Sequence, residues 1–346
     1  MMLTCFSRGF RELPLLVFAL SSISVSFVVA VQTGRTDATK SKYDYANCVA
    51  AISEGRYDFV VKALELHPEL AKESDPEARE TLLHHIAVYG DYRRVGTDAE
   101  AKAIAKLVSC GADLDAYNRH GMTPLMQVAL YYKWRMATQL LDAGANPFLQ
   151  RRVPGDPSHD EEEMDCNESV VDIAASRGFA KLVAGLLEMG APIEYPETIP
   201  KPDEPPRRPS ALHLCCLGQY DRQSCERTQQ MLATIDLLCA RISDINLIDR
   251  NRKTPLLVAA ECSSTVIVEH LLARYPKVNV HAVDDDGNSA LHLAVVDGPA
   301  EDGARIVRVL LKHGADPQLR NIAEETPLDI ARRRKEQLLI DALSGK

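Results

Sequence analysis

The chain has 346 residues, of which 46% are hydrophobic, 26% are charged and only 5% are aromatic, and its formal net charge at pH 7 is −9. This length would ordinarily hold about two globular domains, although an array of repeats escapes that estimate. The acidic balance and the lack of a Lys/Arg stripe disfavour nucleic acid as a partner, because binding to a duplex requires neutralisation of phosphates.

The N-terminal segment has the pattern of an export signal. Arg8 and Arg11 precede an uncharged stretch from 13 to 32, and Val28 and Ala30 fit the −3 and −1 positions of a cleavage site. A short basic region, an apolar core and small residues before a polar stretch are typical of a secretory signal peptide. We therefore expect cleavage after Ala30 and an extracytoplasmic destination, either periplasmic or secreted.

This interpretation divides the chain into three parts. Residues 1–30 are the signal peptide, 31–42 a linker and 43–346 the folded domain. The alternative is an uncleaved membrane anchor, but the 17 residues from 15 to 31 include four serines and fall short of the roughly 20 apolar residues that span a bilayer. Contact with a membrane is expected only if the segment is retained.

A pattern that starts with Thr or Ser recurs along the rest of the chain, for example as "GMTPLMQVAL" and "GNSALHLAVV". Successive starts are 42, 46, 41, 44, 35 and 37 residues apart, at Thr81, Thr123, Ser169, Ser210, Thr254, Ser289 and Thr326. A second pattern with paired leucines before Gly-Ala follows several of them, at 105–115, 138–148, 184–194 and 308–318. The chain is therefore built from repeats.

This two-part unit resembles the ankyrin repeat, whose pattern is T-P-L-H-x-A-A, a turn, an apolar helix with paired leucines, and then G-A-D. The resemblance covers roughly residues 43–346. It implies an all-α solenoid of stacked helix-turn-helix units with short finger turns, about eight units including the caps. A single unit cannot bury its apolar face, so stability comes from stacking.

The helix boundaries have a chemical basis in the sequence. Thr or Ser offers a hydroxyl to the free amides of the first helical turn, and Pro at the first helical position needs no amide partner. Glycine tolerates the left-handed conformation that ends a helix. We expect such stops at Gly111, Gly144, Gly190 and Gly314, an N-terminal cap within 47–70, and a short charged helix at the C-terminus.

The segment "DDDGNSALHLAVVDG" from Asp284 to Gly298 suggests a metal loop at first sight. A calcium loop needs glycine at its sixth position and glutamate at its twelfth, where this chain has Ser289 and Val295. We therefore interpret the acidic run as a finger turn, Ser289 as a helix cap and His292 as a structural hydrogen-bonding group. No metal or cofactor site is predicted.

The spacings exceed the usual ankyrin period of about 33 residues, so several units carry insertions. Two lie on the finger side, at 150–168 and 193–209, and two lie between paired helices, at 91–101 and 219–231. The first is acidic and either contacts a basic partner, holds a divalent ion or is a solvated loop. The second is proline-rich and is either a spacer or a ligand for an aromatic groove.

The position of residues in the ankyrin pattern indicates which side chains are exposed and variable. They line the finger tips and the concave side, and aromatic residues and Arg among them are frequent in interface hot spots. We expect the partner-binding residues to be Arg119, His120, Met122, Leu130, Tyr131, Arg250, Asn251, Lys253, Asp285, Asp286 and Asn288.

The nine cysteines lack the even spacing of a disulfide framework, and most occupy helix positions where small apolar residues belong. Cys216 and Cys225 flank a polar insert and are the one candidate disulfide pair.

No catalytic motif has proper spacing: the chain lacks a G-x-S-x-G elbow, a phosphate-binding Gly-rich loop and an H-E-x-x-H helix. The adjacent histidines at 84–85 should point in different directions on a helix. We expect a non-enzymatic module that binds another protein, with no cofactor and no small-molecule substrate. The alternatives are a secreted effector with enzymatic activity in its inserts, and a membrane-tethered scaffold.

Overall fold

The fold is all-helical in the computed structural model, which describes residues 42–89, 98–151, 168–194, 209–217, 225–296 and 298–345. These residues form sixteen α-helices and one short 3-10 helix, η1 (Pro68–Lys72), and contain isolated β-bridges but no strand. The predicted signal peptide and part of each of the four predicted insertions lie outside the described residues.

The helices alternate between two rows and form eight consecutive pairs. The inner row contains α2 (Tyr45–Ser53), α4 (Leu82–Tyr89), α6 (Pro124–Leu130), α8 (Val170–Ser176), α10 (Ala211–Leu217), α12 (Pro255–Glu261), α14 (Ala290–Val296) and α16 (Pro327–Arg334). The outer row contains α3 (Tyr57–Leu66), α5 (Asp98–Ser109), α7 (Trp134–Asp142), α9 (Ala180–Glu188), α11 (Cys225–Cys239), α13 (Thr265–Arg274), α15 (Ala300–Lys312) and α17 (Gln337–Leu343).

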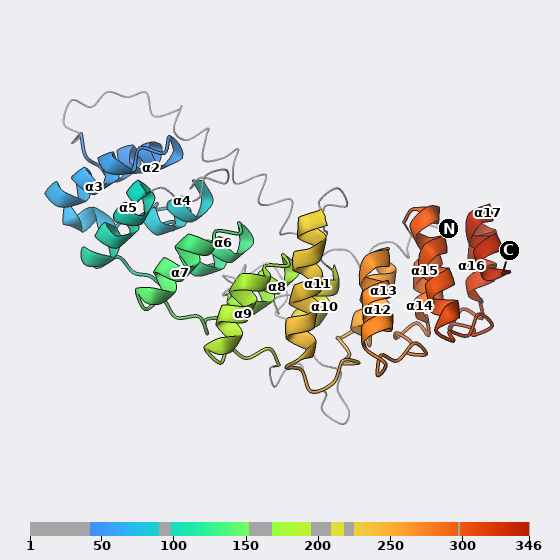
Figure 1. The fold of residues 1–346 in the computed structure, drawn as a ribbon. Coiled ribbons are helices and arrows are strands. Elements are labelled where there is room, and N and C mark those ends of the chain that lie inside the picture. The colour runs from blue at the N-terminus through green and yellow to red at the C-terminus, as the bar shows by residue number, and fades with distance from the viewer. Residues whose placement is uncertain are drawn as a thin grey trace.

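Each helix packs against its partner, and helices of the same row pack against one another from pair to pair. The inner helices pack in chain order from α2 to α16, and the outer helices from α3 to α11 and from α13 to α17 do the same. Figure 1 shows the resulting curved row, which runs from α2 at one end to α17 at the other. The predicted solenoid of about eight units is confirmed.

Hydroxyl caps begin the inner helices, as predicted. The side chains of Thr123, Ser169, Thr254 and Thr326 each accept a hydrogen bond from the backbone amide three residues later. Proline follows three of these caps and lacks the amide that would otherwise need a partner. The four predicted glycine stops are also confirmed, because Gly111, Gly144, Gly190 and Gly314 all have φ between 80° and 97°.

The fingers are short turns that bond to one another. The Arg119 amide donates to the carbonyl of Ala78 at 2.8 Å, and the Ile322 amide donates to the carbonyl of Asp286 at 2.9 Å. The Asp285 amide donates to the carbonyl of Asn251 at 3.2 Å. These bonds join the tips of consecutive fingers, so their backbones are fixed relative to one another.

The acidic insertion leaves the solenoid through a closed neck. Gln150 and Ser169 form an isolated antiparallel bridge, and the Arg151 amide donates to the Glu168 carbonyl at 2.7 Å. The side chains of Arg151 and Glu168 also form an ion pair at 3.1 Å. The chain therefore enters α8 with a normal cap, because the neck holds its two sides together.

The predicted disulfide is wrong. Cys216 and Cys225 are both free, and they lie in different environments. Cys216 is fully buried on α10, where the thiols of Cys239 and Cys262 are close enough to affect it, whereas Cys225 is exposed at the start of α11. The two cysteines are close in sequence, but α10 places the side chain of Cys216 in the core.

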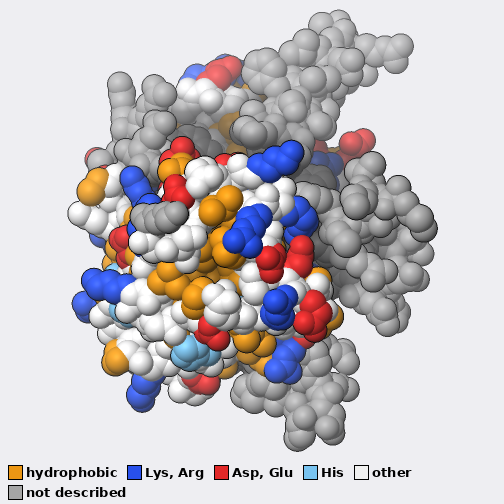
Figure 2. Space-filling model, turned by 90° about the vertical axis from the view of Figure 1, so that its right-hand side faces the viewer, with side chains coloured by type: hydrophobic (Ala, Val, Ile, Leu, Met, Phe, Trp, Pro, Cys, Tyr) orange, Lys and Arg blue, Asp and Glu red, His pale blue; other side chains and the backbone are white. Residues whose placement is uncertain are grey.

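The C-terminal end of the row is only partly polar. Figure 2 views the molecule from this end and shows apolar side chains in the middle, bordered by Lys or Arg and by Asp or Glu. Leu338 on α17 and Ile322 in the last finger are 46% and 73% exposed. None of the helices in the described ranges is both long enough and apolar enough to cross a bilayer.

Candidate binding surface

Three histidines tie each of their repeats to the next finger. In the seventh pair, Nδ1 of His292 lies 3.2 Å from the Ser289 amide and 2.9 Å from its hydroxyl, and Nε2 lies 3.0 Å from the carbonyl oxygen of Glu325. A carbonyl only accepts, so Nε2 carries the proton and Nδ1 is the acceptor. The structural role predicted for His292 is therefore confirmed.

The same arrangement occurs at two other repeats. His84 bonds Thr81 and the carbonyl of Met122, and His213 bonds Ser210 and the carbonyl of Lys253. Burial lowers the pKa of His84 to about 4, so its ring stays neutral and keeps its acceptor nitrogen. These rings hold consecutive repeats together, and both nitrogens of each ring are engaged in hydrogen bonds.

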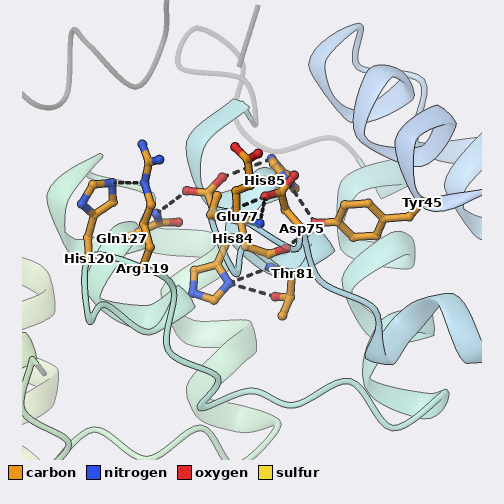
Figure 3. Close-up of polar contacts among 11 residues, drawn as sticks. Tyr45, Asp75, Glu77, Thr81, His84, His85, Arg119, His120 and Gln127 are labelled. Carbon is orange, nitrogen blue, oxygen red and sulfur yellow. Dashed lines mark hydrogen bonds and ion pairs between the residues drawn. The ribbon is translucent and has the colours of Figure 1, made fainter. Parts of the chain in front are cut away.

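The neighbouring ring of His85 points elsewhere, as the helical geometry predicts. Figure 3 shows His84 turned toward Thr81 and His85 turned toward Tyr45 of the preceding inner helix. Nε2 of His85 lies 3.1 Å from the Tyr45 hydroxyl, and Nδ1 lies 3.6 Å from a carboxylate oxygen of Glu80. The side chains of both His85 and Glu80 are largely buried.

The hydrogen bonds of this cluster fix where its protons are. The Tyr45 hydroxyl donates its only proton to the backbone carbonyl of Glu80, so His85 must donate from Nε2 to the Tyr45 oxygen. Nδ1 of a neutral ring then presents a lone pair to Glu80, and it has no hydrogen-bond partner among the described residues. Because the lone pair on His85 Nδ1 and the carboxylate of Glu80 repel each other, protonation of one of these two groups is favoured.

Burial decides which group holds that proton. It raises the pKa of Glu80 and lowers the pKa of His85 to about 4, so the carboxyl group is the better site. The Gln127 amide, 3.5 Å away on α6, also faces this carboxyl. Glu80 thus connects three consecutive inner helices through Tyr45, His85 and Gln127, and it gives the inner face a buried polar centre.

Two later repeats carry ion pairs on the inner face, with opposite polarity. In the sixth pair, Lys253 Nζ lies 2.7 Å from both carboxylate oxygens of Glu261. In the eighth pair, Arg333 lies 3.1 Å from Glu325. In each case the residue before the Thr cap pairs with one in the last turn of the helix. The basic residue comes before the helix in the sixth pair, and the acidic residue does so in the eighth. The inner faces of these two repeats therefore differ in the order of their charges.

The family comparison agrees with this architecture. The family described as "Ankyrin repeats (3 copies)" matches residues 222–321, which include the helices α11 to α15 and the turns between them. Residues 222–321 of the chain are ankyrin repeats.

Two curated relatives extend the similarity along most of the chain. NF-kappa-B inhibitor delta of Mus musculus is 27% identical over 278 residues, which are 78% of each chain. B-cell lymphoma 3 protein of Homo sapiens is 28% identical over 240 residues, 68% of this chain and 44% of the relative. The alignment thus spans less than half of the second relative.

Among solved structures, the ankyrin repeat domain of Bcl-3, titled a unique member of the IkappaB protein family, aligns with a TM-score of 0.48 and 26% identity. The alignment covers 78% of the present chain and all of the Bcl-3 chain.

Most of the predicted partner-binding residues lie at or near the surface. The exposed ones are Arg119, Arg250, Asn251, Asp285 and Asp286, and the half-buried ones are His120, Tyr131, Lys253 and Asn288. In the structure these residues lie close to one another only within one finger or across two adjacent fingers, as in the hydrogen bond from the Asp285 amide to the Asn251 carbonyl. Whether they contact a partner stays a prediction.

Two of the predicted binding residues are not exposed. Met122 and Leu130 are both only 7% exposed, so the expectation that they form part of the surface is wrong. The Met122 carbonyl bonds His84, which places this residue in the seam between two fingers. Leu130 ends α6, which packs between α4 and α8.

One turn residue lies as predicted, and one residue of the polar cluster was not predicted from the sequence. Asp284 is part of a turn, as predicted, and one of its carboxylate oxygens accepts from the amides of Asp286 and Asn288. Glu80 was not predicted, because its role depends on contacts with Tyr45 and Gln127, which lie 35 and 47 positions away in the sequence. A glutamate before a Thr cap and two adjacent histidines were the only local signals.

Proposed function

We propose that this protein is a non-enzymatic binding module that recognises another protein through its finger tips and inner-helix face. The observation that carries the proposal is the bonding between consecutive finger tips. A surface whose backbone is already fixed loses little conformational entropy when a partner binds. Similarity to a protein named as an NF-kappa-B inhibitor supports a role in binding, although that partner belongs to the relative.

The finger tips differ in charge along the row, which favours recognition of one partner in one register. Arg119 in the finger before α6 and Arg250 in the finger before α12 are exposed and basic. Asp286 in the finger before α14 is exposed and acidic, whereas Asp285 beside it forms an ion pair with Arg252 at 3.8 Å. A partner that places a charge of the wrong sign against either group would be disfavoured, so this surface selects by charge.

The polar clusters offer little for catalysis. The described residues contain no group of three or more His, Cys, Asp or Glu side chains placed to hold a metal ion. Of the buried histidines, His84, His213 and His292 have both ring nitrogens engaged in the bonds that stack the repeats. These features support binding rather than turnover.

Site-directed photo-crosslinking in the native host tests this proposal. A photoreactive residue at Asn251 or at Asp286, both on exposed finger tips, should crosslink the same protein. The matched control is Arg305, which is exposed on the outer helix α15. Equal crosslinking of that protein from Arg305, or different proteins from the two finger positions, would contradict recognition by the fingers.

We also propose that the protein is exported, on the basis of residues 1–30. This proposal rests on the charge and apolar pattern of the segment alone. N-terminal sequencing of the protein from its host should give a first residue of Val31. Recovery of the intact segment in a membrane fraction would instead indicate a tethered scaffold.

A further inference from the structure

The fingers share one left-handed backbone position, two residues before the Thr or Ser that precedes each inner helix. Before α6 and α14 this position is Gly121 and Gly287, with φ of 65° and 72°. Before α4, α12 and α16 it is Arg79, Arg252 and Glu324, with φ of 53°, 56° and 59°. The equivalent positions before α8 and α10 lie outside the described residues. Three fingers therefore have a charged residue where two others have glycine.

The hydrogen bond of this turn is the same whether the residue is glycine or charged. The Gly287 amide donates to the carbonyl three residues earlier at 3.0 Å, and the amides of Arg252 and Glu324 make the same bond at 2.9 Å. A Cβ atom is strained in this conformation because it crowds the following carbonyl oxygen, whereas glycine adopts it freely. Glycine would therefore form the turns at Arg252 and Glu324 without strain.

Packing of the three charged side chains does not offset this strain, because all three are exposed. The ion pair between Arg252 and Asp285 is 3.8 Å long, and its two side chains are 61% and 55% exposed. An ion pair this exposed contributes little to stability. Backbone strain that the folded state does not need is found mainly at functional sites.

Bonds between neighbouring finger tips hold the strained residues in place. The residues directly before Arg79 and directly before Arg252 each accept such a bond through the carbonyl oxygen. The amide two residues before Glu324 donates one to the finger before α14. The three charged side chains therefore start from fixed backbone positions, which lowers the entropy lost when a partner binds.

The three strained residues are spread along the row. They precede α4, α12 and α16, the second, sixth and eighth inner helices (Figure 1). Packed helices lie about 8–10 Å apart, so the six steps from α4 to α16 cover roughly 50 Å. Ten fully extended residues reach at most about 35 Å, so a short peptide cannot contact all three side chains.

We propose that Arg79, Arg252 and Glu324 select a folded partner protein whose facing surface is acidic opposite the two arginines and basic opposite the glutamate. These contacts presuppose the proposed binding function and name the finger residues that give it specificity. Charges of opposite sign at separate places along the row also fix the orientation of the partner, because a reversed partner would meet like charges.

Glycine substitution measures the strain. Arg252→Gly and Glu324→Gly should each raise the thermal midpoint by about 1–3 °C, whereas Arg252→Ala keeps the strained Cβ and should not raise it. The matched control is Lys335→Gly, which replaces an exposed charged residue with φ of 61° in the turn between α16 and α17 and should also raise the midpoint. An unchanged midpoint in both finger variants would overturn the proposal, since no strain would then need an explanation.

A photoreactive residue at Asp286, an exposed tip position that none of these variants changes, measures partner binding in the native host. The yield of the crosslinked protein should fall at least about fivefold in Arg79→Gly, Arg252→Gly and Arg252→Ala. Lys335→Gly should keep the yield within about twofold of that of the wild type. The finger variants should thus lose binding while their folded state is retained or stabilised.

The outcomes separate this proposal from the proposed function. Finger variants that gain stability and keep the wild-type yield would overturn the selective role of these residues and leave binding by the fingers intact. A wild-type chain that crosslinks no protein from its finger tips would overturn the binding function and this proposal together. A crosslinked species whose mass falls on nuclease treatment would overturn the assignment of a protein partner.

Two further variants test the charges expected on the partner. Arg252→Lys keeps the positive charge and should retain the yield within about twofold. Glu324→Lys reverses the charge and should lower the yield below that of Glu324→Gly, because it places a cation against a basic group. Equal yields from Glu324→Lys and Glu324→Gly would overturn the basic group assigned to the partner.

Discussion

The Nε2 atom of His292 donates to the carbonyl oxygen of Glu325 at 3.0 Å, so the side chain that helps to cap one repeat also bonds the finger of the next. This relationship makes capping and stacking parts of the same interaction. His84 and His213 repeat it in the second and fifth pairs.

Replacing His292 should therefore cost more than the loss of one cap. We expect His292→Ala to lower the free energy of unfolding by about 2–4 kcal/mol, because it leaves a cavity and an unpartnered carbonyl. His313→Ala removes an exposed histidine and should change stability by less than about 0.5 kcal/mol. Urea unfolding followed by circular dichroism measures both. Equal effects would show that the bridge to Glu325 contributes nothing.

The Glu80 cluster predicts a pH-dependent effect. A raised pKa means that the folded state holds the Glu80 proton more tightly than the unfolded state, so stability is lost as the pH rises above about 4.5 toward the folded pKa. Glu80→Gln is always neutral and can donate toward His85. Relative to the wild type, this variant should gain stability between pH 4.5 and pH 8. Urea unfolding at several pH values tests this, and a constant difference would contradict it.

Two helical glycines should respond oppositely to the same substitution. A Cβ on Gly303 would lie 2.6 Å from the Ala294 carbonyl oxygen, whereas one on Gly185 would meet only Trp134, at 3.7 Å. Gly303→Ala should destabilise by about 1–3 kcal/mol through overpacking of α15 against α14. Gly185→Ala should stabilise by about 0.5–1 kcal/mol through helix propensity. Thermal unfolding of both variants checks the sign, and destabilisation by both would refute the contrast.

The thiols should differ strongly in reactivity. Burial raises the pKa of Cys216 well above its ordinary range and the pKa of Cys48 to about 11, whereas Cys225 is exposed. Brief alkylation under native conditions should modify Cys225 first and leave Cys48 and Cys216 intact. Peptide mass spectrometry without reduction should show no bond between Cys216 and Cys225. Such a bond in the protein from its host would contradict the fold at α10.

The sequence by itself determined the repeat and its local chemistry. Thr254 followed by Pro255 predicts the capped start of an inner helix, and Gly314 predicts the end of the outer helix α15, because these preferences depend on a few adjacent dihedral angles. The stacked, all-helical fold followed from the recurrence of this unit, since each copy must bury its apolar face against the next.

Only the tertiary structure decided which polar residues act together. Met122 matched an exposed position of the repeat yet is buried, and Glu80 attracted no notice yet connects three inner helices. Arg177 and Arg227 meet at Tyr132 because α11 is unusually long and Gly178 lets it approach. Contacts of this kind depend on how separate repeats pack against one another. The spacing of residues within one repeat does not encode that packing.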